Sequence, residues 1–156
     1  DVVIGPMIDK GELERIEQWI QEAVQEGAKL LCGGKADGLV MNATILENVS
    51  HESKLYKDEA FGPVMILEAY DDFDKGIELA NDSRFGLQVG VYSSSINKAM
   101  QAWDSIEAGG VIINDVPTFR VDNMPYGGVK DSGFGREGVK YAIEDMTEVR
   151  LMVVKD

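Results

Sequence analysis

The chain has 156 residues, and its 44% hydrophobic and 28% charged content is typical of an ordinary globular protein with one sizeable core. The 28 acidic and 15 basic side chains give a formal net charge of −13, which disfavours nucleic acid and anionic membrane surfaces as partners. One cysteine and one histidine exclude an internal disulfide and a Cys/His zinc site, so no metal site is expected.

The N-terminal sequence has no basic-then-apolar signal segment, and no apolar run approaches the length needed to cross a bilayer. Together with the lone cysteine, these features predict a cytoplasmic location. The chain opens on Asp1 and the apolar stretch DVVIGPMI, a beginning typical of the interior of a longer sequence. We therefore expect a piece of a larger protein.

The first predicted element is an amphipathic helix over 10–26. Asp9 and Glu12 have the spacing of a capping box, and apolar residues recur at helical spacing until Gly27 favours a stop. Strand and helix patterns then alternate, which predicts an α/β fold with right-handed crossovers and a mostly parallel sheet. The expected elements are strands at 29–32, 40–46 and 64–67, the last covered on both faces, a helix at 73–80, a strand at 87–92, a helix at 96–107 and a strand at 111–113.

The last part of the chain is dominated by a Gly- and Pro-containing loop over 114–134. A loop of this length is more often functional than a simple connector. A short helix is predicted at 135–145 and a final strand at 148–155, with apolar residues on both of its faces. A terminal strand of this kind needs a partner, which can belong to another chain.

Three features that could carry chemistry receive structural interpretations. Cys32 ends an apolar run with no His close in sequence and no helix N-terminus to activate its thiol, so we expect a small buried side chain. His51 lies in a polar stretch, where a surface or capping role is expected. The GFGREG segment at 133–138 matches the dinucleotide fingerprint G-x-G-x-x-G, but it follows a loop and not a strand. Its glycines are therefore interpreted as sites of tight turns and close packing.

Glu59 and Phe61 allow two interpretations from the residues alone. A surface acid and a core aromatic residue are the simpler ones. Alternatively, the Glu59 carboxylate accepts hydrogen bonds from a vicinal diol, and the Phe61 ring two residues on covers a flat heterocycle. The spacing alone does not decide between them.

Longer motifs are more specific. E-x-F-G-P at 59–63 and P-[aromatic]-G-G-x-K-x-S-G-x-G-R-E at 125–137 resemble the NAD(P)-dependent aldehyde dehydrogenase superfamily, and the leading GPMIDKGELERIEQWIQEAVQEGAKLLCGG is similar to the same family. The resemblance covers essentially the whole chain in one colinear order. It implies a three-layer α/β/α fold like that of the family's catalytic domain. Residues 1–146 would be the C-terminal part of that domain and 147–156 an oligomerisation strand.

The same resemblance implies an enzyme that oxidises an aldehyde to the acid with NAD or NADP and assembles as a homodimer or homotetramer. The family's cysteine nucleophile, general-base glutamate and oxyanion-hole asparagine would all precede Asp1, and Cys32 corresponds to a non-catalytic position. We therefore expect no catalytic residue in this chain, an inactive isolated chain and a cofactor bound mainly by residues outside it. The alternative is a binding or assembly module without enzymatic work of its own.

Individual site residues follow from the resemblance. Glu59 matches the family glutamate that binds the nicotinamide-side ribose hydroxyls, and Phe61 matches the aromatic residue beside that end of the cofactor. Asn114 matches the asparagine at the start of the substrate-side loop, with a structural or pocket-lining role. Tyr126 stands where the family often has a phenylalanine lining the aldehyde pocket, and Phe119 occupies the same loop.

Arg120 lies in this loop, which in family members acting on acidic aldehydes supplies a cation to the far end of the substrate. One hypothesis is that the substrate carries a carboxylate, phosphate or phosphonate that Arg120 binds, as expected of a lactaldehyde, glyceraldehyde-3-phosphate, succinic semialdehyde or phosphonoacetaldehyde enzyme. The alternative is a loop arginine paired with Asp115 or Asp122. Neither the aldehyde nor the choice between NAD and NADP follows from the sequence.

Overall fold

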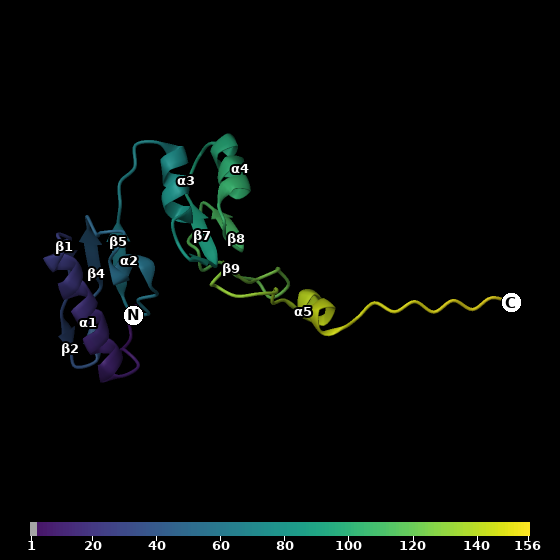
Figure 1. Cartoon of the computed structure of the whole chain (residues 1–156), viewed down its shortest axis with the longest axis horizontal. Coiled ribbons are helices and arrows are strands. Elements are labelled where there is room, and N and C mark those ends of the chain that lie inside the picture. Colours follow the sequence, from purple (N-terminus) through teal and green to yellow (C-terminus); the bar gives the residue numbers. More distant parts are fainter. Residues whose placement is uncertain (1–2) are drawn as a thin grey trace. The chain divides into compact units, whose positions relative to one another are not determined.

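The computed structural model describes residues 3–156, which divide into two compact units (Figure 1). The first unit ends at Ala69 and the second begins at Tyr70. Both units combine helices with short strands, which confirms the predicted α/β class. In chain order the elements are α1 (Lys10–Gln25), β1 (Lys29–Cys32), β2 (Ala36–Asp37), β3 (Val40–Met41), β4 (Thr44–Glu47), α2 (Lys54–Lys57), β5 (Val64–Leu67), α3 (Phe73–Asn81), β6 (Phe85–Gly86), β7 (Gln88–Val91), α4 (Ile96–Ser105), β8 (Gly110–Ile113), β9 (Val129–Lys130) and α5 (Val139–Met146).

Strand pairing is mixed in both units. β4 and β5 are parallel, and so are β7 and β8, because a helix connects the two strands of each pair. β1 pairs antiparallel with the other edge of β4, so the sheet of the first unit has the order β1–β4–β5. β2 with β3 and β6 with β9 form short antiparallel pairs.

Helix α1 packs on the sheet of the first unit. It begins at a capped N-terminus, where the Asp9 carboxylate accepts a hydrogen bond from the Glu12 backbone N–H at 2.9 Å. It ends before Gly27, whose φ of +113° suits glycine. One apolar face of the helix is buried in the core of this unit. The buried core residues are Met7, Leu13, Ile16, Ile20, Ala23, Ala28, Met41, Leu46, Val49 and Leu55.

Two strands of the first unit differ from the prediction. The expected strand at 40–46 is divided into β3 and β4, because the chain changes partner at Thr44, whose backbone N–H donates to the Pro63 carbonyl at 2.9 Å. β5 forms as expected, but within the described part of the first unit only one of its faces is covered. Met65 and Leu67 are 51% and 46% exposed, while Val64 and Ile66 pack against the core.

The second unit is built on the parallel pair β7–β8. Helices α3 and α4 contribute buried Ile77 and Ala102, and Ile106 follows α4. Val89, Val91 and Val111 from the two strands pack against these residues. The polar Asn81 side chain ties the two helices, since its Nδ2 donates to the Ser105 carbonyl at 2.8 Å. A small core therefore fixes the pair from which the long 114–134 loop departs.

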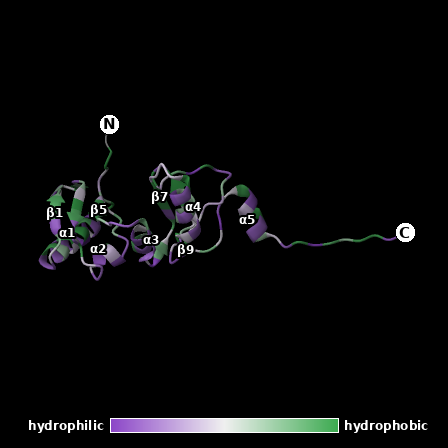
Figure 2. Ribbon diagram, turned by 90° about the horizontal axis from the view of Figure 1, so that it is seen from above, coloured by the Kyte–Doolittle hydropathy of each residue, from purple (hydrophilic) through white to green (hydrophobic). Residues whose placement is uncertain are grey.

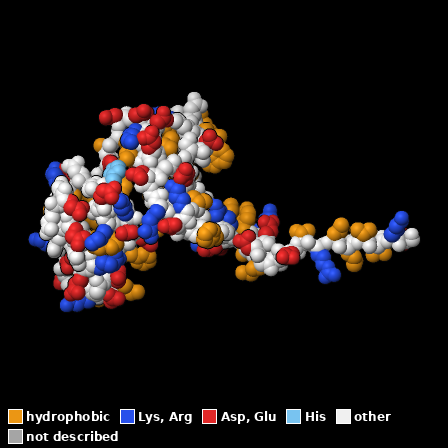
Figure 3. All heavy atoms as spheres, viewed as in Figure 1, with side chains coloured by type: hydrophobic (Ala, Val, Ile, Leu, Met, Phe, Trp, Pro, Cys, Tyr) orange, Lys and Arg blue, Asp and Glu red, His pale blue; other side chains and the backbone are white. Residues whose placement is uncertain are grey.

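Residues 147–156 form no strand with the described part of the chain, although the sequence predicts one at 148–155. The segment is extended beyond α5 (Figure 1), and hydrophobic and hydrophilic residues are mixed along it (Figure 2). Hydrophobic side chains project from both of its sides (Figure 3). A strand exists only through hydrogen bonds to a neighbour, so the apolar pattern alone does not produce one. Its exposed apolar residues are Val149, Leu151, Met152, Val153 and Val154.

Candidate functional site

Glu59 and Phe61 lie in the segment that connects α2 with β5. Both side chains are exposed, and Phe61 is 77% exposed, so its interpretation as a core residue is wrong for this chain. The φ of Phe61 is +52°, in the left-handed region that aromatic residues rarely adopt. A strained backbone of this kind persists only where the surrounding structure holds it, and such positions cluster at ligand-binding sites.

An arginine of α1 holds this segment. The Arg15 Nη2 atom donates to the Ala60 carbonyl at 2.9 Å, between Glu59 and Phe61 in sequence. Two further hydrogen bonds orient the same guanidinium. Its Nε and Nη2 atoms both donate to one carboxylate oxygen of Glu12, at 2.9 and 2.6 Å. The segment is thus attached to a capped helix that is itself packed on the core.

In the second unit, Arg120 and Tyr126 are in contact. The Arg120 guanidinium carbon lies 4.3 Å from the centroid of the Tyr126 ring. Its Nη2 atom forms an ion pair with Glu137 at 2.7 Å, so the partner of Arg120 is Glu137 and neither Asp115 nor Asp122. The three residues form one compact group.

Backbone hydrogen bonds also join Tyr126 and Glu137 of this group. The Tyr126 N–H donates to the Glu137 carbonyl at 3.1 Å, and the Glu137 N–H donates back to the Tyr126 carbonyl at 2.6 Å. The two residues are thereby fixed opposite each other as in an antiparallel pair. The Arg120 side chain spans from the Glu137 carboxylate to the Tyr126 ring and is held from both ends.

Asn114 and Phe119 occupy the start of the same loop. The Asn114 side-chain oxygen accepts a hydrogen bond from the Ser93 backbone N–H at 2.8 Å, and its φ of +61° turns the chain out of β8. Its contacts therefore join the ends of β7 and β8. The Phe119 carbonyl accepts a hydrogen bond from the Gln88 side chain at 3.2 Å, which ties the loop to β7.

The glycines of the GFGREG segment serve turns and close packing, as predicted. Gly133, Gly135 and Gly138 all have positive φ, and Gly138 precedes α5. The Arg136 side chain donates to the Gly128 carbonyl at 3.0 Å, which ties the segment to the residue before β9. The segment bends the chain so that Glu137 meets Tyr126.

Cys32 and His51 lie outside both groups. Cys32 is exposed, which contradicts the expected buried side chain, and its Sγ is 3.7 Å from the Ala43 carbonyl oxygen. It falls at the end of β1, an edge strand whose other side has no covering strand in this unit. His51 has the surface role expected of it, because its ring stacks on Tyr56 and its Nε2 lies 2.9 Å from Glu68.

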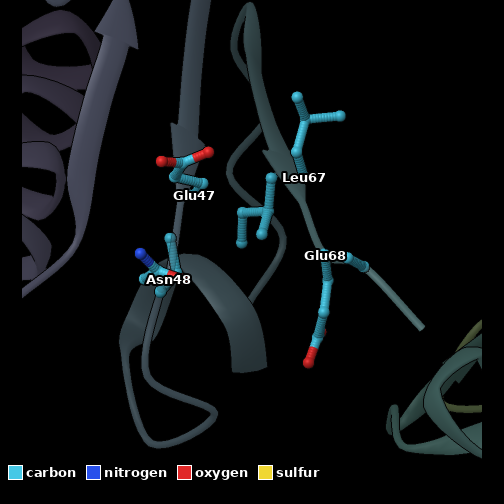
Figure 4. A pocket seen from close by; sticks show the side chains of 7 residues that line it. Glu47, Asn48, Leu67 and Glu68 are labelled. Carbon is cyan, nitrogen blue, oxygen red and sulfur yellow. The ribbon is translucent and has the colours of Figure 1, made fainter. Parts of the chain in front are cut away.

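A hollow of about 410 Å³ opens at the C-terminal ends of β4 and β5 (Figure 4). Its acidic residues already have partners, since Glu47 pairs with Lys29 at 2.7 Å and Glu68 accepts from His51 and Tyr56. None of the six residues predicted for the site lines it. Its lining residues are Glu47, Asn48, Val49, Ile66, Leu67, Glu68 and Ala69.

The six predicted residues fall into two groups. Glu59 and Phe61 belong to the first unit, and the other four belong to the second, where Arg120 meets Tyr126. Sequence reasoning missed Arg15, which carries no local signal because its contact with Ala60 spans 45 residues. It also missed Glu137, which stands inside the G-R-E motif and could have been singled out there.

Across residues 3–156, no cluster of three or more His, Cys, Asp or Glu side chains is arranged to hold a metal ion. Within the same range, no helix is both long and apolar enough to cross a membrane.

Comparisons with known proteins agree with the motifs. The model of the family described as "Aldehyde dehydrogenase family" matches residues 1–152. A 3-sulfolactaldehyde dehydrogenase from Priestia megaterium is 52% identical over 97% of this chain and 32% of its own length. A lactaldehyde dehydrogenase from Methanococcus maripaludis is 47% identical over 97% of this chain and 32% of its own length.

Among solved structures, aldehyde dehydrogenase 21 from Physcomitrella patens, in complex with the reaction product succinate, is 47% identical with a TM-score of 0.92. The similarity covers 95% of this chain and 31% of that one. The chain therefore spans about a third of the length of the relatives it matches.

Proposed function

Because this chain belongs to the aldehyde dehydrogenase family, we propose that it is the C-terminal part of an enzyme that oxidises an aldehyde to the acid with NAD or NADP. Residues 1–146 belong to the catalytic domain in this proposal, and 147–156 form a strand that joins subunits. The observation that carries it is that Glu59 and Phe61 are both exposed in one segment, where Phe61 has a positive φ and Arg15 of α1 binds the Ala60 carbonyl between them.

This pair fits one end of a nicotinamide cofactor. The Glu59 carboxylate can accept hydrogen bonds from two neighbouring ribose hydroxyls, and the exposed Phe61 ring offers an apolar surface to the adjoining ring. NAD(P)+ supplies the hydride acceptor in the family's reaction. The residues of this chain bind and orient that end of the cofactor, and the groups that react with the aldehyde lie in the rest of the enzyme.

The aldehyde-facing part of the proposal rests on the second unit. In this proposal Tyr126 and Phe119 belong to the wall of the aldehyde site, and Asn114 accepts a hydrogen bond from the Ser93 backbone N–H at the start of the loop. Arg120 binds an anionic group at the far end of the aldehyde. The relatives support an anionic substrate, since one is named for a sulfonated lactaldehyde and another was solved with succinate.

The test of the cofactor role is Glu59→Gln in the full-length protein. The amide retains the shape and loses the charge, and hydrogen bonds to a charged group contribute about 1.5–3 kcal/mol. We expect kcat/KM for NAD(P)+ to fall about 10- to 100-fold. Glu52→Gln, an exposed glutamate of the same unit that pairs with Lys57, is the matched control and should leave this ratio unchanged. Equal values for the two variants would contradict the proposal.

The second candidate function is an assembly module without activity of its own, which the exposed apolar segment 147–156 supports. Incubation of the isolated chain with an aldehyde and NAD+ bears on both candidates. Turnover by the isolated chain contradicts the proposal that its catalytic residues lie elsewhere. A silent isolated chain fits both candidates, and light scattering then measures whether the chain still assembles.

A further inference from the structure

Arg15 of α1 contacts the segment carrying Glu59 and Phe61. Its guanidinium has three kinds of contact at once. It pairs with Glu12, it donates to the Ala60 carbonyl at 2.9 Å, and its Cζ lies 4.4 Å from the centroid of the Trp19 ring. The Arg15 side chain is 29% exposed, against 81% for Lys10 and 61% for Glu14 of the same helix.

These contacts leave the guanidinium little freedom. Glu12 sits one turn before Arg15 and Trp19 one turn after it, so the side chain lies along the helix between a carboxylate and an aromatic face. The Nη2 atom, which already donates one N–H to Glu12, donates its second N–H to the Ala60 carbonyl. The helix thus presents a fixed donor to a loop that is 45 residues away in sequence.

The segment at 58–63 needs such a contact. It has neither helix nor strand structure, and Phe61 within it has a φ of +52°. Backbone contacts secure its far end, where the Val64 N–H donates to the Gly62 carbonyl at 2.8 Å. The Ala60 carbonyl is secured by Arg15, and this peptide unit lies directly between the two residues of interest.

We propose that Arg15 is a positioning residue for the nicotinamide cofactor: by fixing the Ala60 carbonyl, it sets the directions in which the Glu59 carboxylate and the Phe61 ring project. This inference rests on the proposed role of Glu59 and Phe61. Arg15 itself touches neither cofactor nor substrate. Its loss therefore impairs cofactor use and leaves aldehyde recognition, which belongs to the second unit, unchanged.

The experiment uses the full-length enzyme with Arg15→Met, which keeps the apolar stem over Trp19 and removes every donor. We expect kcat/KM for NAD(P)+ to fall about tenfold, while KM for the aldehyde at saturating cofactor stays within twofold of the unaltered enzyme. Arg15→Lys retains the charge without the planar fork, so its kcat/KM for NAD(P)+ should lie between the values of the unaltered enzyme and of Arg15→Met. Lys10→Met, in the exposed Lys10–Glu14 pair of the same helix, is the control and should change neither constant.

A milder variant guards against a folding defect. Glu12→Gln leaves Arg15 in place and removes the charge that aims it, so we expect a two- to threefold fall in kcat/KM for NAD(P)+ with an unchanged thermal midpoint. A loss that affects cofactor and aldehyde constants equally, or that follows the thermal midpoint across all variants, overturns the inference. Such a result would assign Arg15 a purely structural role.

Combination with Glu59→Gln separates the two proposals. If Arg15 acts through Glu59, the double variant Arg15→Met with Glu59→Gln loses little more than Glu59→Gln alone. Fully multiplicative losses overturn the positioning role and leave the Glu59 role intact. If Glu59→Gln changes nothing while Arg15→Met does, the proposed function fails at Glu59, and the inference that depends on it fails as well.

Discussion

Arg15 and Arg120 are held in the same way in different units of the chain. Arg15 pairs with Glu12 and Arg120 with Glu137, and each guanidinium also lies over an aromatic ring. The planar, permanently charged fork suits this arrangement, because it can stack and donate at the same time. Each of these arginines is therefore a preorganised donor, which is what a binding site requires of a long side chain.

The prediction for Arg120 concerns substrate charge. In the full-length enzyme, Arg120→Met removes the cation and retains an apolar side chain of similar length against Tyr126. We expect KM for a carboxylated or phosphorylated aldehyde to rise at least about tenfold, the value of one lost charge-assisted hydrogen bond. KM for a neutral aldehyde of similar size should stay within about twofold.

The control for this prediction is Lys140→Met, which removes an exposed cation of α5 that pairs with Glu144. It should affect neither class of aldehyde. Equal increases for anionic and neutral aldehydes in Arg120→Met would show that Arg120 serves only the loop, through its pair with Glu137.

Gly109 allows the 114–134 loop to approach closely, because this residue has no side chain. A Cβ atom at this position would lie 1.6 Å from the Gly127 carbonyl oxygen, so the backbone beside Tyr126 would have to move. We expect Gly109→Ala to destabilise the protein by about 1–3 kcal/mol and to lower kcat/KM for the aldehyde. Gly5→Ala is the control, because its Cβ meets nothing within 4 Å. Matching thermal midpoints for the two variants would refute the close approach.

The residues of the site were predictable only where the contact is local or the motif is long. Tyr126 stands in the P-Y-G-G motif, and Arg120 lies in the loop that the resemblance assigns to the far end of the substrate. Arg15 was not predicted, because its contact with Ala60 spans 45 residues and no pattern within a short window encodes it. Glu137 stands in the G-R-E motif, but its partner Arg120 lies 17 residues away and becomes apparent only in the folded chain.

At the scale of elements, helices were easier to predict than strands for the same reason. The bounds of α1 follow from Asp9, from the apolar spacing and from Gly27, all of which act within a few residues. The strand expected at 148–155 did not form, since a strand is defined by the neighbour to which it bonds. The prediction that β5 is covered on both faces failed for a similar reason, because burial depends on what packs against the strand.

One element-scale prediction concerns the tie between α1 and α2. Lys54 of α2 pairs with Glu22 of α1 at 2.8 Å, and its hydrogen bond, followed by that of Gln18, lowers the pKa of the Glu22 carboxyl from its usual 4.5. A depressed pKa contributes stability above the unfolded-state value, and the contribution is lost as the pH falls through the folded-state value. Lys54→Met should therefore lower the thermal midpoint slightly at pH 7.

The same variant should show no deficit at a pH well below 4.5, where Glu22 is protonated in the folded and unfolded states alike. The effect is small throughout, because the pair is exposed to solvent. Lys35→Met, at another exposed lysine of the first unit, serves as the reference. A deficit that persists unchanged into acid would mean that Lys54 contributes through packing and not through its charge.

At the scale of the whole molecule, apolar side chains remain exposed in both units. Met65 and Leu67 of β5 are half exposed in the first unit, and Met100 and Trp103 of α4 are 55% and 64% exposed in the second. Exposed apolar surface of this kind marks interfaces with other protein. It supports the proposal that the chain works as one part of a larger, multi-subunit enzyme.

The segment 147–156 is where that proposal predicts a contact between subunits. Leu151 and Val153 alternate along one side of it, and an added strand would place both against the neighbouring subunit. Replacing both by lysine in the full-length protein puts two charges into that contact, so the mass measured by light scattering should fall to that of a smaller assembly. Arg150→Gln, on the opposite side, should retain the original mass. If the double lysine variant also retains it, the segment does not join subunits, and assembly must depend on other surfaces.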